Sequence, residues 1–247
     1  MKQLLQKEKI QTDLTLPCLT KYISQSGFCS RRTAVIHIKS GQVWINEMCT
    51  IDPSYRVKPN DKVLVKGVPI GKKDRVIYIL LNKPKDCIST LSDEKGRHCV
   101  ADIFKPFFKE RLFPVGRLDR NTTGVLLMTN DGNLAQRLSH PQFEVPKVYH
   151  VSLDHPLKHE DLMEIKHGVK LEDGMLNLDY IGYLKTKSDL LVELHSGKNR
   201  VIRRLFEYFG YTVKKLDRVA FAGIEKAGTR PGTWRFLSSQ EVEALKH

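Results

Sequence analysis

Over residues 16–67 the apolar positions first repeat at a helical period and then at a strand period. Two short helices are predicted, and the second begins after Ser30, a favourable N-cap residue, and stops at Gly41. The apolar helical positions are Leu19, Tyr22, Ile23, Ala34, Val35 and Ile38. Val43 and Ile45 then repeat with the period of two that is typical of a strand, and Asn46-Glu47 is predicted to be a turn. The segment is therefore predicted to form a small α/β domain.

A second, larger pattern begins at residue 76. Residues 1–15 are polar and are expected to be a loosely held tail, and residues 68–75 mix glycine, proline and charge as a linker does. The apolar run at residues 76–81 predicts a buried strand, and strands and helices alternate irregularly after it. Several of these strands show a period of two, so residues 76–247 are predicted to be an α+β domain with a mixed, mainly antiparallel sheet.

The charge of the chain indicates a polyanionic partner. Lys and Arg number 41 against 28 Asp and Glu, a net charge of +13, and cations that neutralise phosphates release condensed counterions. The five cysteines never form C-x-x-C, which gives no support to a zinc ribbon or a disulfide framework, and the longest apolar run has six residues. We expect a soluble cytoplasmic protein with no membrane segment and no bound metal.

The most informative stretch of the large domain surrounds Asp119. This residue lies in a loop between Arg117 and Arg120, just before a predicted buried strand at residues 125–129 and a predicted helix at residues 133–138. A carboxylate on a loop that a rigid strand supports is a common position for a nucleophile or a base. The alternative at this point is a surface aspartate paired with a neighbouring arginine.

Two further segments carry candidate chemistry. Residues 147–153 alternate as a strand with Lys147 and Tyr149 on one face, where an aromatic ring serves either the core or a binding site. Asn199 is a predicted N-cap, and Gly210 a predicted C′ residue, of an amphipathic helix. Its first turns carry crowded cations that the helix dipole disfavours, so we expect an anionic partner from outside the protein. The alternative is a solvated helix face.

Residues 19–48, LTKYISQSGFCSRRTAVIHIKSGQVWINEM, resemble an S4-type RNA-binding domain. The stretch GRLDRNTTGVLLMTNDG at residues 116–132 resembles the signature of the bacterial RsuA/RluB/RluE/RluF family of ribosomal RNA pseudouridine synthases, and the K-x-Y and G-x-N-R-x-I-R-R elements follow in order. The resemblance implies that Asp119 is the nucleophile, that Tyr149 stacks on the target base and that Arg203 pairs with Asp119. Leu216 is expected either to form the apolar wall of the base pocket or to belong to the core.

What the resemblance implies about partners is specific. The substrate would be ribosomal RNA, of the large subunit by similarity to the RluB and RluF members, and the reaction would need no cofactor. Residues expected to bind this RNA are Lys21, Arg31, Arg32, Lys39, Arg117, Arg120, Lys147, Lys198, Asn199 and Arg200. Asp86 stands where the family commonly has glycine, and aspartate tolerates the left-handed backbone that a turn requires there.

We expect the chain to act as a monomer. The alternatives are a non-catalytic ribosome-assembly factor that keeps this fold, and a DNA-binding regulator that uses residues 19–41 as a helix-turn-helix. The second alternative leaves the motifs of residues 76–247 without an explanation.

Overall fold

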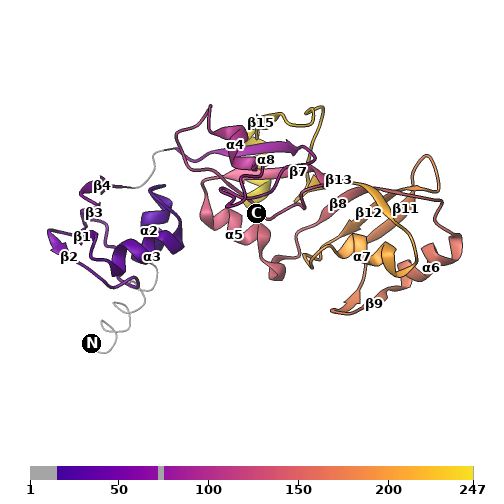
Figure 1. Cartoon of the computed structure of the whole chain (residues 1–247), viewed down its shortest axis with the longest axis horizontal. Helices are drawn as coiled ribbons and strands as arrows, with labels where there is room; N and C mark the ends of the chain where they lie inside the picture. The colour runs from indigo at the N-terminus through magenta and orange to yellow at the C-terminus, as the bar shows by residue number, and fades with distance from the viewer. Residues whose placement is uncertain (1–15, 72–74, 247) are drawn as a thin grey trace. The chain divides into compact units, whose positions relative to one another are not determined.

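The structure is a computed structural model that describes residues 16–71 and 75–246. The expected polar tail, residues 1–15, lies outside the described residues. The described residues fall into two compact units, within residues 1–76 and 77–247 (Figure 1). Buried apolar residues form one core cluster in the first unit and three in the second.

Two helices and a four-stranded sheet make up the described part of the first unit. Helix α2 spans Leu19–Gln25 and helix α3 spans Arg31–Lys39. The Ser30 side chain accepts a hydrogen bond from the Thr33 amide at 3.0 Å, so the predicted N-cap is confirmed. Leu19, Ile23, Ala34 and Ile38 are buried against the sheet residues of this core, which leaves the basic residues of both helices toward the surface.

The sheet of the first unit is antiparallel throughout, in the order β2-β1-β3-β4. The strands are β1 (Val43–Ile45), β2 (Met48–Cys49), β3 (Val63–Val65) and β4 (Val68–Ile70). Two-residue turns with positive φ at both positions join β1 to β2 at Asn46-Glu47 and β3 to β4 at Lys66-Gly67. The expected linker is therefore wrong at its start, because residues 68–70 pair with β3 instead.

A mixed sheet forms the second unit, in the order β11-β12-β8-β13-β7-β5-β15, with β14 beside β13 and β6 beside β7. Its strands are β5 (Tyr78–Lys83), β6 (Phe113–Pro114), β7 (Thr123–Thr129), β8 (Lys147–Leu153), β11 (Tyr180–Tyr183), β12 (Asp189–Leu194), β13 (Val213–Phe221), β14 (Ile224–Glu225) and β15 (Trp234–Phe236). The β7–β13 pair is parallel and every other pair is antiparallel, so the predicted mixed, mainly antiparallel sheet is confirmed.

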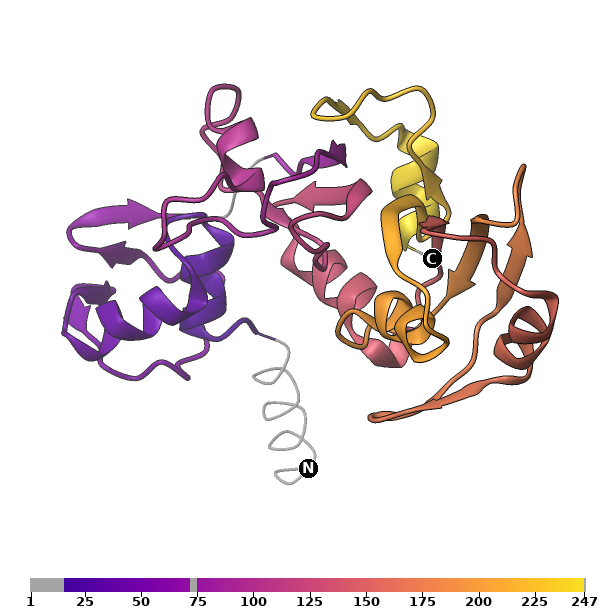
Figure 2. The same ribbon diagram turned by 45° about the vertical axis from the view of Figure 1, so that its right-hand side comes forward.

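Helices and a small hairpin surround this sheet. They are α4 (Val100–Phe104), α5 (Gly132–Ser139), the 3₁₀ helix η1 (Pro141–Phe143), α6 (His159–His167), α7 (Val201–Tyr208) and α8 (Ser239–Lys246), and the hairpin strands are β9 (Val169–Leu171) and β10 (Gly174–Leu176). Helix α6 contacts β11 and helix α7 contacts β9, at the β11–β12 end of the sheet (Figure 2).

The parallel pair between β7 and β13 requires a glycine. Gly124 has φ +103°, and a Cβ added to it would lie 2.2 Å from the carbonyl oxygen of Arg218. Beside it the Thr123 hydroxyl donates to Asp217 at 2.7 Å. This close approach fixes the start of β7, and hence the loop before it, against the middle of β13.

Candidate active site

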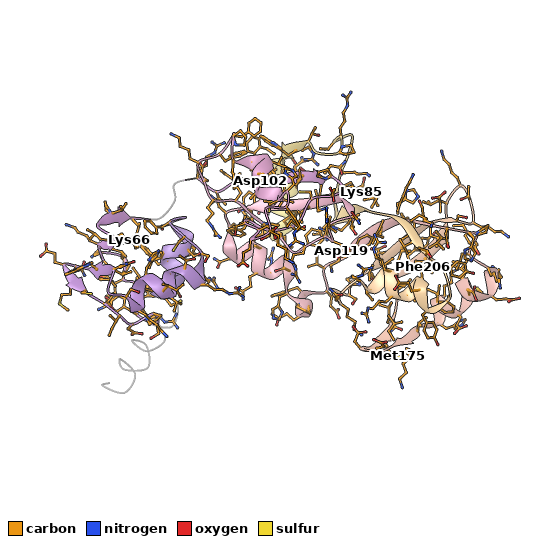
Figure 3. The ribbon with its side chains drawn as sticks, viewed as in Figure 1. Lys66, Lys85, Asp102, Asp119, Met175 and Phe206 are labelled. Atoms are coloured by element: carbon orange, nitrogen blue, oxygen red, sulfur yellow. The ribbon has the colours of Figure 1, made fainter. Side chains whose placement is uncertain are left out.

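Asp119 lies in the loop that connects β6 to β7. Its side chain is 40% exposed, and Figure 3 shows it toward the middle of the second unit, between Asp102 of α4 and Phe206 of α7. The Thr122 amide donates to the Asp119 carbonyl oxygen at 3.1 Å, which closes a turn directly after the aspartate. The carboxylate therefore faces solvent from a turn whose backbone is held.

The last residue of β5, Lys83, and the segment after it hold this loop by hydrogen bonds to its backbone. Lys83 is fully buried, and its Nζ donates to the carbonyl oxygens of Thr122 at 2.8 Å and of Arg120 at 3.2 Å. The Ser89 hydroxyl donates to the Leu118 carbonyl oxygen at 2.9 Å and accepts from the Leu118 amide at 3.1 Å. Burial lowers the pKa of Lys83 to about 8.

Asp86 lies in the same supporting segment. Its φ is +63°, so aspartate does adopt the left-handed conformation expected at this position. Its carboxylate accepts from Arg120 Nε at 2.6 Å, and this ion pair is largely exposed. Arg120, expected to bind RNA, is thus tied in part to the supporting segment, whereas Arg117 on the other side of Asp119 is exposed.

Arg203 of helix α7 is the cation nearest to the Asp119 carboxylate. Its Nε lies 4.0 Å from Asp119 Oδ2, an ion pair that is too long for a hydrogen bond. The Arg203 side chain is only 13% exposed, and Nη1 donates to the Val213 carbonyl oxygen at 2.9 Å. Burial lowers the pKa of Arg203, the Arg200 charge adds to this effect, and the Asp119 charge opposes it. The guanidinium is therefore fixed by the fold and placed within reach of the carboxylate.

A cleft of about 710 Å³ opens in front of Asp119. Its side chains come from the loop after β5, the Asp119 loop, strands β8 and β13, and the residues before helix α7. The charged residues that line it are Asp93, Arg97, Arg117, Asp119, Arg120, Lys147, Lys198, Arg200 and Arg218. Seven cations against two carboxylates make this a cleft for a polyanion, and its volume suits a nucleotide.

Tyr149 and Leu216 form part of the wall on the sheet side. Tyr149 of β8 packs against two of the core clusters of this unit and lines the cleft. Leu216 is 6% exposed, belongs to one of these cores and also lines the cleft. The two alternatives kept open for Leu216, core residue and cleft wall, are therefore both true of its position.

Comparison with known proteins identifies the family. Residues 77–208 match the model of the RNA pseudouridylate synthases, and residues 19–63 match the S4 domain. The chain belongs to the RNA pseudouridine synthases. It is 37% identical to the ribosomal large subunit pseudouridine synthase B of Bacillus subtilis strain 168, over 92% of this chain and 95% of that one. It is 35% identical to the dual-specificity RNA pseudouridine synthase RluF of Escherichia coli K12, over 91% of this chain and 76% of that one.

A solved structure, described as a pseudouridylate synthase, shares the fold of this enzyme. Its TM-score is 0.65 at 23% identity, and the match covers 94% of this chain and all of the other. Within the part of the enzyme that the structure describes, none of the helices has the length and apolar character needed to cross a membrane. Nor do three His, Cys, Asp or Glu side chains of the described ranges come close enough to share a metal ion.

The residues around the start of helix α7 differ from the sequence prediction in the position of the N-cap and in the partners of two cations. The N-cap position is Arg200, with φ +46° and no side-chain cap, and not Asn199. Asp173 of the β9–β10 hairpin pairs with Arg204 Nη2 at 2.7 Å and lies 3.6 Å from Lys198 Nζ. The expected external anion is thus wrong for these two cations, because the enzyme supplies an internal one, whereas Asn199 and Arg200 remain exposed at the cleft.

Lys147 also differs from a freely exposed phosphate ligand. Its Nζ donates to the carbonyl oxygens of Val145 at 2.6 Å and His195 at 2.7 Å. Burial lowers the pKa of Lys147 to about 8, and the nearby charge of Arg218 adds to this effect. The ammonium lines the cleft with two of its three hydrogens already used.

Sequence reasoning did not select Lys83, Asp173 or Arg218 as residues of this site. Neither Lys83 nor Arg218 carries a local signal of burial in the sequence. Asp173 is one exposed carboxylate among many in the sequence. The four residues expected to bind RNA in the first unit are Lys21, Arg31, Arg32 and Lys39, and within the described residues none of them pairs with a carboxylate.

Proposed function

We propose that this enzyme converts a uridine of large-subunit ribosomal RNA to pseudouridine, with Asp119 as its nucleophile. One observation carries the assignment of Asp119. Of the two carboxylates that line the cleft, Asp93 is occupied by Arg97, which donates from its backbone and from both Nε and Nη2. Within the described residues the Asp119 carboxylate has only the 4.0 Å contact with Arg203, so its oxygens are available to a substrate.

The substrate class follows from charge and from the relatives. The cleft walls carry an excess of cations, and the first unit presents exposed Arg31, Arg32 and Lys39 from an S4 domain. The Bacillus subtilis relative, which covers nearly the whole chain, is named for the large ribosomal subunit. These features together favour a structured ribosomal RNA over a free nucleotide, which would need no second basic domain.

The reaction is an isomerisation, so the uridine neither gains nor loses atoms or electrons overall. The bond from uracil N1 to the ribose C1′ breaks, the uracil turns within the cleft, and C5 bonds to C1′. The proton that leaves C5 is balanced by a proton gained at N1. Tyr149 supplies a ring at the cleft wall on which the unstacked base can rest, and base–aromatic stacking contributes about 1–3 kcal/mol.

Arg203 has a distinct role in this proposal. Its guanidinium places a fixed positive charge 4.0 Å from the carboxylate that is proposed to react. Because Nη1 of Arg203 is held by the Val213 carbonyl oxygen, the charge is in place before the substrate arrives. The remaining cations of the cleft, Arg117 and Arg200 foremost, contact the RNA backbone from exposed positions.

The test is the formation of pseudouridine in ribosomal RNA, mapped by mass spectrometry, with purified wild-type protein and two matched variants. Asp119→Asn should abolish turnover and leave RNA affinity within about threefold, because the substitution is isosteric and removes only the reactive carboxylate. Asp86→Asn, which neutralises an exposed carboxylate of the neighbouring turn, should stay within about tenfold of wild type.

Two results would contradict the proposal. Turnover by Asp119→Asn comparable to that of Asp86→Asn would remove Asp119 as the nucleophile. Pseudouridine formed only in small-subunit or transfer RNA would contradict the assigned substrate and leave the chemistry standing. As part of the same proposal, the enzyme acts as a monomer in the cytoplasm, where ribosomal RNA is modified.

A further inference from the structure

Arg218 occupies the centre of the sheet beneath the cleft. It lies on β13 between its neighbours in register, Tyr149 of β8 and Gly124 of β7. The residue is 2% exposed and yet lines the cleft. Its Nε donates to the Val125 carbonyl oxygen at 2.8 Å, and its guanidinium carbon lies 4.4 Å from the centre of the Phe221 ring. These contacts fix the guanidinium in one orientation.

The charge of Arg218 is not balanced by the fold. Within the described residues no carboxylate forms an ion pair with it, and Nη2 is buried without a hydrogen-bond partner. The charge of Arg218 also lowers the pKa of Lys147, so these two charges repel one another. A buried guanidinium with an unused donor destabilises the folded protein, and a role in the site is the physical reason to keep one.

Tyr149 is the polar side chain that faces this guanidinium. The two residues are directly opposed across the antiparallel β8–β13 ladder, where side chains of paired residues lie on the same face of the sheet. Burial lowers the pKa of Arg218, and the Tyr149 side chain is the neighbour that opposes this change, through charge and hydrogen bonding. Arg218 is therefore linked directly to the proposed base-stacking residue.

We propose that Arg218 is a positioning residue for the isomerisation, whose guanidinium holds the Tyr149 side chain across the β8–β13 ladder and so fixes the ring against which the uracil turns. The inference rests on the proposed function. Tyr149 packs against two of the core clusters and also lines the cleft, so a partner that fixes its side chain also fixes this part of the cleft wall. A fixed ring keeps the freed base within bonding distance of C1′.

The geometry explains why arginine serves this position. The planar guanidinium donates from Nε to the backbone of β7, which fixes the directions in which its other N–H groups point. A lysine ammonium in the same place has no such fork and cannot hold both the Val125 carbonyl oxygen and the Tyr149 hydroxyl in these positions. Replacement by lysine thus keeps the charge and removes the second contact.

A double-mutant cycle tests the proposal. The single-turnover rate constant and the RNA dissociation constant are measured for wild type, Arg218→Lys, Tyr149→Phe and the double variant on a ribosomal RNA transcript. Each single substitution should lower the rate constant by about tenfold or more with affinity changed less than about threefold. The double variant should be no slower than the slower single variant, because both substitutions remove the same contact.

A second readout is independent of activity. In protein labelled with fluorotyrosine, the fluorine resonance of residue 149, assigned by its absence in Tyr149→Phe, should shift and broaden in Arg218→Lys. Lys215→Arg is the matched control, because Lys215 is exposed on the same strand and is opposed to Ser152 of β8. This control should leave both the resonance and the rate constant unchanged.

The outcomes separate the two proposals. If the rate losses of Arg218→Lys and Tyr149→Phe multiply in the double variant, or if the resonance of residue 149 does not respond to Arg218→Lys, Arg218 does not position Tyr149. Thermal unfolding of each variant shows whether a loss of rate reflects an unfolded protein. For folded Arg218→Lys, the fluorine resonance of residue 149 then shows whether Tyr149 has lost its fixed position. A wild-type protein that forms no pseudouridine in ribosomal RNA contradicts the proposed function itself, while an active wild type with independent effects contradicts only this inference.

Discussion

Lys83 Nζ donates to the Thr122 carbonyl oxygen at 2.8 Å, so a fully buried ammonium at the end of β5 holds the turn that follows Asp119. The residues are 39 positions apart in the chain, and the same ammonium also reaches the carbonyl oxygens of Pro84 and Arg120. The loop that carries the proposed nucleophile Asp119 is thus held by a residue that does not line the cleft.

Replacement of Lys83 should affect stability and turnover together. Lys83→Met leaves three carbonyl oxygens without their buried donor and should lower the free energy of unfolding by about 1–3 kcal/mol. The loosened loop should lower kcat by about tenfold or more, because small displacements of a reacting group slow the reaction. Lys85→Met, at an exposed position two residues on, is the control and should change neither quantity. Chemical denaturation and initial rates measure the two effects. A Lys83→Met variant with wild-type kcat would show that the hydrogen bonds of Lys83 are not needed for reactivity.

The same lysine predicts a pH dependence of stability. Burial holds the pKa of Lys83 at about 8, against 10.5 for an exposed lysine. Between these two values the unfolded chain binds more protons than the folded one, so the contribution of Lys83 to the free energy of unfolding rises as pH increases. Denaturation of wild type and Lys83→Met at about pH 7.5 and about pH 9.5 isolates the contribution of Lys83 to the free energy of unfolding. The wild-type advantage should grow at the higher pH, and a difference between the two proteins that does not vary with pH would contradict the assignment.

Asp173 should restrain non-specific binding of RNA. Its carboxylate neutralises Arg204 and Lys198 beside the cleft, so Asp173→Asn frees two cations for phosphate contacts. The slope of log affinity against log salt should become steeper by about one unit for unrelated RNA. Glu172→Gln is the control, because it changes the net charge equally at an adjacent exposed position without breaking either ion pair. Equal slopes for the two variants would mean that net charge alone, and not the release of these cations, governs binding.

The first unit should provide affinity and not chemistry. A chain that begins at Arg75 removes 13 basic and six acidic residues, a net charge of +7. It should still modify a short RNA fragment, while its salt slope on structured ribosomal RNA becomes shallower by about three units or more. Full-length protein with Lys21, Arg31, Arg32 and Lys39 all replaced by Gln is the matched control and should show most of the same change. Unchanged slopes in both proteins would show that this unit does not contact the RNA backbone.

Local signals in the sequence were enough for much of this description. Ser30 caps α3 because its side chain bonds to an amide only three residues away, and Gly210, with φ +83°, follows helix α7 as predicted. The left-handed Asp86 and the Asn46-Glu47 turn were likewise predictable, since backbone preferences act within a few residues. The predicted helix at residues 133–138 is observed as α5, one residue longer at each end.

Pairing between distant segments decided where the strands lie. The predicted strand at residues 76–81 is displaced to Tyr78–Lys83, because its hydrogen-bonding partners are residues of β7 and β15. Residues 68–70 look like a linker by composition but form β4, because the turn at Lys66-Gly67 folds them back onto β3. An apolar run marks a strand, but its limits depend on which neighbours offer free backbone groups.

The sequence by itself determined the two-domain organisation, the mixed sheet, the family and the candidate Asp119, because each is carried by contiguous residues. Only the tertiary structure decided that Arg203 lies 4.0 Å from that carboxylate, that Asp173 neutralises Lys198 and Arg204, and that Lys83 and Arg218 are buried. Burial and charge pairing are set by side chains that are tens of residues apart in the chain, and the composition around a lysine or arginine does not reveal whether water or protein will surround it.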